Sequence, residues 1–93
     1  MKIKNLIEKA VATYMDDVIA WRRHIHQHPE VSGQEKETSA YIQGVLDSLG
    51  IPYKNDVFQY AVIGIIQGAK PGKTVALRAD MDALPIYEKF LLI

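Results

Sequence analysis

The sequence predicts an α/β protein in which two N-terminal helices pack on a partial β-sheet. In the first half of the chain, apolar residues recur every three or four positions, which is typical of amphipathic helices. After Pro52 the pattern changes to β-branched and aromatic runs, which favour strands. The sheet is expected to be incomplete, because two or three strands make only a narrow sheet and residues 60–66 are too apolar for an exposed edge strand.

The first helix is predicted from near Lys4 to near Gln27. Pro29 should end it, because the residue before a proline avoids the helical conformation. The apolar stripe that predicts this helix comprises Ile3, Ile7, Ala10, Tyr14, Val18, Trp21 and Ile25.

The second helix is predicted over residues 34–49. Residues 32–35, Ser-Gly-Gln-Glu, have the form of a capping box, in which the Ser32 hydroxyl accepts a hydrogen bond from the Glu35 backbone N–H. Gly50 suits the position after the last helical residue, and Pro52 prevents the helix from continuing.

Two strands are predicted from the runs at residues 57–66 and 74–77. Residues 68–73 contain proline and glycine in turn-forming order, so the two runs are expected to pair as a hairpin. Residues 52–56 are a candidate for a short additional strand.

Composition excludes several classes of protein. The 93 residues carry 11 basic and 11 acidic side chains, so the zero net charge favours neither a nucleic-acid partner nor a membrane surface. No apolar run approaches the ~20 residues of a membrane span. The chain has no cysteine, which excludes disulfides and thiolate zinc sites and favours a cytoplasmic location.

Three histidines alternate at positions 24, 26 and 28, and they raise the question of a metal site. Residues two apart on a helix point in nearly opposite directions, so the spacing argues against one ligand set. His24 and His28 have the i, i+4 spacing of helical ligands, but Pro29 disturbs the helix at that point. A polar helix end is the favoured interpretation.

Two carboxylates, Asp80 and Asp82, follow the second predicted strand in the run LRADMDALPI. Side chains two apart on an extended segment point to the same side, so they could share a cation. Catalytic metals usually take three protein ligands, so the pair is not a sufficient site. The alternative is that these aspartates cap loop N–H groups or pair with Arg78.

Two motifs together resemble a known family. Residues 22–32, RRHIHQHPEVS, are similar to the opening RR-x-x-H-x-H-P-E-x-S of the metal-dependent amidohydrolases that include hippurate hydrolase, indole-acetyl-amino-acid hydrolases and N-acetyl-diaminopimelate deacetylase. Residues 77–86 match the LRADMDALPI of that family, and the resemblance spans residues 16–89. Glu35, Glu37 and Thr38 resemble its E-x-E-T, residues 49–51 its L-G-I, and Glu88 the glutamate that follows.

The resemblance implies an α/β/α zinc-peptidase-like catalytic domain, of which residues 1–93 are an N-terminal portion without the lid and dimerisation domain. It implies hydrolysis of the amide bond of N-acyl amino acids with two divalent metals (Zn, Mn or Co). In such sites the metals polarise the carbonyl and activate water, and a glutamate transfers the proton.

The resemblance also bears on the aspartates. Asp80 stands where distant branches have a metal-binding histidine, and Asp82 stands where they have the aspartate that orients it. In the branch that this sequence resembles, the main ligands come from a later Cys-Gly-His-Asp stretch, a Glu-Glu pair and further histidines, which are absent here. Asp80 and Asp82 are therefore expected to line a site or support its ligands, and Asp80 alone is also a weak candidate for a metal ligand. No complete catalytic set and no bound metal are expected for this chain alone.

Three interpretations remain open. In the first, the chain is the N-terminal part of an amidohydrolase and is inactive alone, either as a piece of a longer protein or as a shortened product. In the second, it is a non-catalytic remnant that forms homo-oligomers or binds a partner through its open sheet edge or the apolar tail at residues 90–93. In the third, it is a marginal fragment with no function of its own that is stable only as an oligomer.

Overall fold

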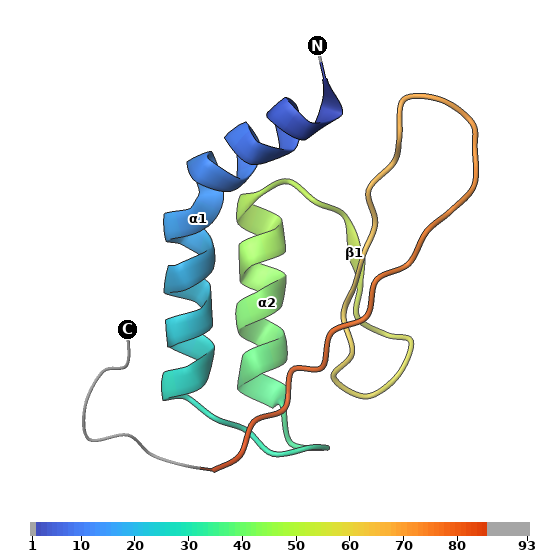
Figure 1. Ribbon diagram of the computed structural model, residues 1–93. Coiled ribbons are helices and arrows are strands. Elements are labelled where there is room, and N and C mark those ends of the chain that lie inside the picture. The colour runs from blue at the N-terminus through green and yellow to red at the C-terminus, as the bar shows by residue number, and fades with distance from the viewer. Residues whose placement is uncertain (1, 86–93) are drawn as a thin grey trace. The chain divides into compact units, whose positions relative to one another are not determined.

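The computed structural model describes residues 2–85. The chain divides into two units, one containing residues 2–28 and the other residues 29–85, and each is described by itself. In chain order the elements are helices α1 and α2 and strands β1 and β2 (Figure 1). Two helices and a small antiparallel sheet agree with the predicted α/β class, whereas the likeness to a zinc-peptidase domain stays a prediction.

Helix α1 covers Ile3–Gln27, as its apolar periodicity predicts. His28 leaves the helical conformation, with φ −127° and ψ 63°, directly before Pro29, which is the expected effect of a proline on its predecessor. Figure 1 shows that α1 bends along its length. The Thr13 hydroxyl donates to the Lys9 carbonyl oxygen at 2.9 Å, and hydrogen bonds of this kind often bend a helix.

Helix α2 covers Lys36–Ser48 and begins two residues later than predicted. The expected capping box is wrong, because Ser32 lies in the turn Val31–Gln34, whose last N–H donates to its first carbonyl oxygen at 3.0 Å. Gly33 has φ +84°, the left-handed value that a type II turn requires at its third position. Glu35 is the N-cap instead, and its side chain makes no capping hydrogen bond.

The C-terminal end of α2 confirms the prediction for Gly50. Its φ is +69°, and its N–H donates to the Asp47 carbonyl oxygen at 3.1 Å. The Ile51 N–H donates to the Leu46 carbonyl oxygen at 2.9 Å. These two bonds form a Schellman motif, which satisfies carbonyl groups of the last helical turn and turns the chain away from the helix axis.

The sheet contains two short strands. Strand β1, Tyr53–Lys54, pairs antiparallel with strand β2, Ile63–Gly64, and the Ile65 N–H extends the ladder by donating to the Pro52 carbonyl oxygen at 2.8 Å. The register places Tyr53 opposite Gly64 and Lys54 opposite Ile63. The additional strand expected within residues 52–56 is thus confirmed, whereas most of the strand predicted over residues 57–66 is loop.

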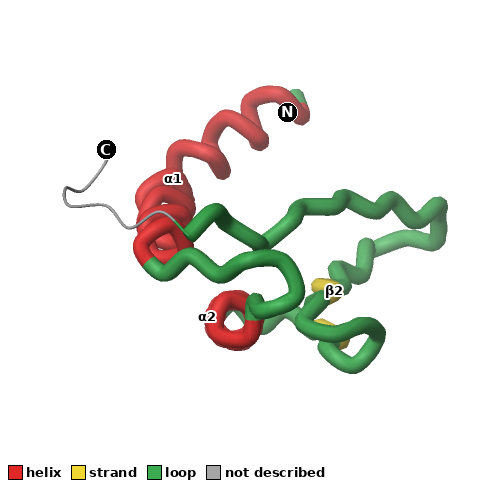
Figure 2. Tube along the Cα trace, turned by 90° about the horizontal axis from the view of Figure 1, so that it is seen from below, coloured by secondary structure: helices red, strands yellow, loops and turns green. Residues whose placement is uncertain are grey.

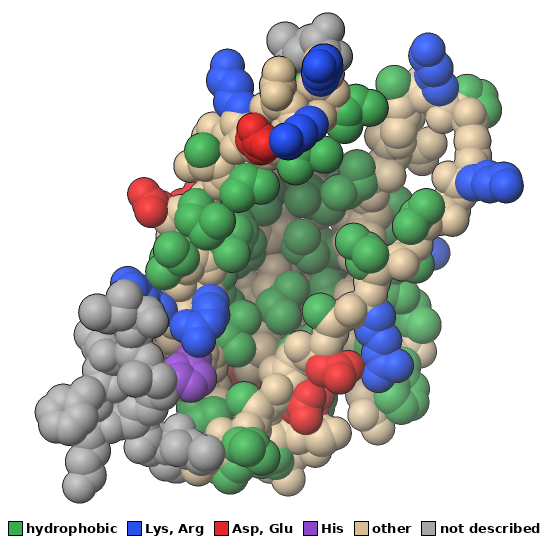
Figure 3. Space-filling model, viewed as in Figure 1, with side chains coloured by type: hydrophobic (Ala, Val, Ile, Leu, Met, Phe, Trp, Pro, Cys, Tyr) green, Lys and Arg blue, Asp and Glu red, His purple; other side chains and the backbone are tan. Residues whose placement is uncertain are grey.

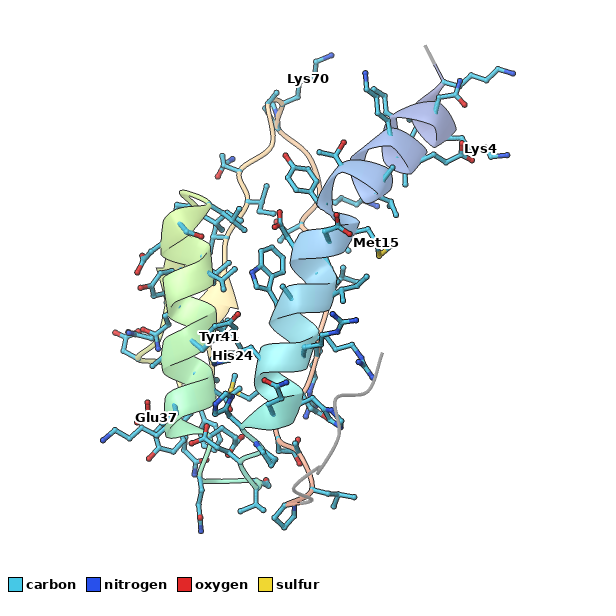
Figure 4. The ribbon with its side chains drawn as sticks, turned by 90° about the vertical axis from the view of Figure 1, so that its left-hand side faces the viewer. Lys4, Met15, His24, Glu37, Tyr41 and Lys70 are labelled. Carbon is cyan, nitrogen blue, oxygen red and sulfur yellow. The ribbon has the colours of Figure 1, made fainter. Side chains whose placement is uncertain are left out.

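The predicted hairpin between residues 57–66 and 74–77 is wrong. In the part of the chain that the structure describes, residues 74–77 form no strand, and Val75 and Leu77 are 83% and 98% exposed. Figure 2 shows the segment after β2 as loop, and Figure 4 shows Lys70 at its tip. β-Branched residues favour a strand only where a neighbouring strand supplies hydrogen bonds and packing, and here none does.

Apolar burial is slight throughout. No apolar side chain among residues 2–85 is buried, and Figure 3 shows hydrophobic side chains on the visible face of the protein. Strand β2 approaches the end of α2: a Cβ built at Gly64 would be 3.7 Å from Leu46 Cδ2 and 3.8 Å from Ile51 Cγ2. Neither α1 nor α2, in their described extent, is long and apolar enough to cross a membrane.

Candidate functional site

Asp80 and Asp82 lie in an extended segment and do not follow a strand, contrary to the prediction. Both residues are exposed. The Arg78 guanidinium donates from Nη2 to Asp80 Oδ1 at 3.2 Å, so the alternative of a local pair is the one observed for Asp80. The Arg78 and Asp80 side chains are 90% and 70% exposed, and an ion pair between side chains this exposed contributes only ~0–1 kcal/mol to stability.

The described side chains do not by themselves fit a metal ion. Over residues 2–85, no group of three or more histidine, aspartate or glutamate side chains could hold one. Asp80 and Asp82 supply two carboxylates at most, and a catalytic metal usually needs three protein ligands.

The segment that carries Asp80 and Asp82 is attached to the rest of its unit by its backbone. The Ala83 N–H donates to the Glu30 carbonyl oxygen at 2.8 Å. Figure 1 shows this segment, coloured red, passing the N-terminal end of α2. The contact joins Glu30, from the first motif of the family resemblance, to Ala83, from the second.

The Glu30 side chain caps helix α2. Its Oε2 accepts from the Glu37 backbone N–H at 3.1 Å, and its Oε1 accepts from the Thr38 backbone N–H at 2.5 Å. A carboxylate suits this position because the first N–H groups of a helix lack partners within the helix and the helix dipole favours negative charge there. Hydrogen bonds from the Thr38 side chain and then the Thr38 backbone lower the pKa of Glu30; desolvation opposes them, and the Glu37 backbone N–H lowers the pKa further.

The start of α2 is the most enclosed part of the second unit. Thr38 and Ser39 are buried, at 5% and 3% exposure. The Gln43 side-chain amide donates to Ser39 Oγ at 3.1 Å, and the Asn55 side-chain amide donates to Gln43 Oε1 at 2.8 Å. A series of polar contacts therefore links α2 to the loop after β1.

Sequence reasoning missed this role of Glu30. The motif fragment H-P-E and the threonine of E-x-E-T were both identified, but only as signs of ancestry. The available signal was a glutamate shortly before a turn and a helix, but residues 32–35 already had the form of a capping box, which predicted a different cap. The eight-residue separation of Glu30 and Thr38 is too large for a standard capping box, in which three residues separate the partners.

The histidines lie at the end of α1, as expected. His28 Nδ1 lies 2.8 Å from the His24 carbonyl oxygen, and the two imidazole rings stack with their centroids 4.5 Å apart. A carbonyl oxygen can only accept, so Nδ1 of His28 carries the proton. This arrangement satisfies a carbonyl group of the last helical turn and agrees with the favoured interpretation of a polar helix end.

Known proteins resemble the chain at their N-terminal ends. It is 44% identical over 86 residues to the N-acyl-L-amino acid amidohydrolase of Geobacillus stearothermophilus, covering 92% of this chain and 23% of that protein. It is 43% identical over 79 residues to the N-acetyl-L-cysteine deacetylase of Bacillus subtilis, covering 85% of this chain and 19% of that protein. With thermostable carboxypeptidase 1 of Saccharolobus solfataricus the identity is 48% over 88 residues, covering 90% of this chain and 22% of that protein.

No protein-family model and no solved structure matches the chain. The chain spans about a fifth of the length of the curated relatives it matches. The identities nevertheless extend over most of its residues and agree with both motifs of the resemblance. The chain is therefore similar, over most of its residues, to the N-terminal part of these amidohydrolases and related hydrolases.

Proposed function

We propose that residues 1–93 form the N-terminal portion of a metallopeptidase-like catalytic domain that hydrolyses the amide bond of N-acyl amino acids. The observation that carries this proposal is the 44% identity, over 92% of the chain, to an N-acyl-L-amino acid amidohydrolase. The named N-acetyl-L-cysteine deacetylase supports the same class of substrate. A cytoplasmic location is part of the proposal, in keeping with the absence of cysteine.

In this proposal Asp80 and Asp82 line the site or support ligands that other segments of a complete enzyme contribute. Two divalent metals, Zn, Mn or Co, are implied by the resemblance. The described residues do not fit such ions without further ligands, so the chain by itself is expected to hydrolyse nothing. Its contribution is to present the two carboxylates from a segment that is hydrogen-bonded to Glu30, the residue whose side chain caps α2.

A chimera tests the proposal. Residues 1–86 replace the matching N-terminal segment of the Geobacillus amidohydrolase, and hydrolysis of N-acetyl and N-benzoyl amino acids is measured with Zn²⁺, Mn²⁺ or Co²⁺. The chimera is expected to be active, whereas the 93-residue chain alone is expected to be inactive under the same conditions. Metal-dependent turnover by the chain alone, or a folded chimera without activity, would contradict the proposal.

The two aspartates are tested in the same chimera. Groups that orient metal ligands typically affect activity by ~10–100-fold, so Asp82→Asn and Asp80→Asn should each lower kcat/KM within that range. Asp56→Asn is the matched control, because Asp56 is an exposed aspartate in the loop between the two strands. Equal activity of all three variants would remove Asp80 and Asp82 from the proposed site.

Exposed apolar surface favours a second candidate, in which the isolated chain is non-catalytic and forms homo-oligomers or binds a partner. Ile66 is 83% exposed and Leu77 is 98% exposed, and strands β1 and β2 form a sheet with two open edges. The apolar tail that was expected to contribute lies outside the described residues. Light scattering after size exclusion should then detect dimers or larger species. A monomer at all concentrations would exclude self-association.

A further inference from the structure

Glu30 accepts hydrogen bonds through both its side-chain carboxylate and its backbone carbonyl group. Its carboxylate oxygens accept from two backbone N–H groups at the start of α2, and its own carbonyl oxygen accepts from Ala83. One residue therefore joins the helix to the segment that carries Asp80 and Asp82.

The hydrogen bond from Ala83 to Glu30 is the one backbone bond that ties the described residues 66–85 to the rest of the unit. Among described residues, no other backbone hydrogen bond joins residues 66–85 to another part of the chain. The ion pair of Asp80 with Arg78 is internal to the segment, so it does not locate the segment. The position of the two aspartates relative to α2 accordingly depends on where the Glu30 backbone lies.

The carboxylate determines where that backbone lies. Both oxygens are engaged by N–H groups of consecutive residues, Glu37 and Thr38, which limits rotation of the side chain. Charge-assisted hydrogen bonds of this kind are about twice as strong as neutral ones. Replacing the carboxylate by an amide would remove the charge and leave only one oxygen to accept.

We propose that Glu30 is a positioning residue, which uses its carboxylate to hold α2 and its carbonyl oxygen to hold the backbone next to Asp82. The effect of Glu30 on catalysis rests on the proposed function. The effect of Glu30 on the position of residues 80–85 can be tested on the 93-residue chain alone. It differs from a simple capping role, which would affect α2 and leave residues 80–85 unchanged.

Amide hydrogen exchange of the 93-residue chain tests the structural part. In Glu30→Gln, exchange at Ala83 should accelerate by about three- to tenfold, the effect of one lost hydrogen bond on a local opening equilibrium. Glu37→Gln is the matched control, because Figure 4 shows Glu37 near the start of α2 and its hydrogen bond to Glu30 comes from the backbone N–H, which the substitution keeps. Faster exchange at Thr38 with unchanged exchange at Ala83 would overturn the proposal.

The unmodified chain provides a second measurement if Glu30→Gln fails to fold. As the pH is lowered until Thr38 loses its protection against exchange, the protection factor of Ala83 should fall over the same range. Protection at Ile51, in the Schellman motif at the other end of α2, should persist. Protection at Ala83 that survives the loss at Thr38 would contradict the proposed linkage.

The chimera tests the catalytic part. Misplacement of a reacting site by about 1 Å can cost ~100-fold in rate, so Glu30→Gln should lower kcat by ~10–100-fold with KM nearly unchanged. Glu37→Gln should leave both constants unchanged. An active chimera in which Glu30→Gln has normal kcat would overturn the positioning role. A chimera without activity would instead count against the proposed function, while the exchange result at Ala83 would still stand.

Discussion

The same substitution, glycine to alanine, should have opposite effects at two positions of helix α2. Gly44 lies inside Lys36–Ser48, and Gly50 follows the helix with φ +69°. A Cβ added at either position would meet nothing within 4 Å, so packing does not enter the comparison. Any difference between Gly44→Ala and Gly50→Ala must therefore come from the backbone conformation.

The expected magnitudes follow from that conformation. In a helix interior alanine is favoured over glycine by ~0.8–1.0 kcal/mol, so Gly44→Ala should raise the free energy of unfolding by about that amount. A left-handed φ costs an L-residue roughly 1–2 kcal/mol, so Gly50→Ala should lower it by a similar amount. The two variants should thus differ by ~2–3 kcal/mol.

Urea denaturation of the 93-residue chain, followed by circular dichroism at the helical band, measures these changes. In a domain of this size 1 kcal/mol corresponds to a shift of about 4–8 °C in Tm, so thermal unfolding gives a second measurement. Changes of the same sign at both positions would refute the assignment of Gly50 to the Schellman motif. So would a Gly50→Ala variant as stable as the parent protein.

Three further predictions concern ionisable side chains. The pKa of Glu30 in the folded state lies below its usual value of 4.5. The stabilisation by Glu30 is therefore complete above pH 4.5 and is lost as the pH falls through the folded-state pKa. Glu30→Gln should remove this part of the dependence of Tm on acid pH. The pKa of Tyr53 is raised, first by desolvation and then by the hydrogen bond to Asp47 and the charge of Asp47. The stabilisation by Tyr53 is therefore present below its usual pKa of 10.0 and is lost as the pH rises through the raised pKa. Tyr53→Phe should make Tm depend less on pH at the alkaline end. Arg78→Ala should lower the free energy of unfolding by no more than ~1 kcal/mol in urea titrations, because its pair with Asp80 is at the surface. A larger loss would show that this pair anchors the segment.

The helices were predictable because their determinants are local. The apolar repeat and Pro29 predict α1 to within about a residue at each end, and Gly50 marks the end of α2 correctly. Helical hydrogen bonds join residues four apart, and the Schellman motif needs only the last turn and the next two residues. The start of α2 was less accurate, because its cap comes from Glu30, before the turn that contains Gly33.

Strand pairing was not predictable from the apolar runs. Residues 57–66 and 74–77 have strong β propensity, yet the ladder forms between Tyr53–Lys54 and Ile63–Gly64. Strand propensity describes a side chain that suits a pleated, half-buried surface, and it does not specify the partner. The close approach of Gly64 to Leu46 and Ile51 agrees with a ladder formed directly after α2.

By itself, the sequence determined the α/β class, the two helices with the glycine that ends the second, and the relationship to amidohydrolases through its two motifs. Only the tertiary structure decided which segments pair as strands and that Glu30 joins α2 to Ala83. The physical reason is the distance along the chain. Helix periodicity and turns depend on neighbours within a few residues, whereas the contact between Glu30 and Ala83 exists only once the chain has folded back on itself.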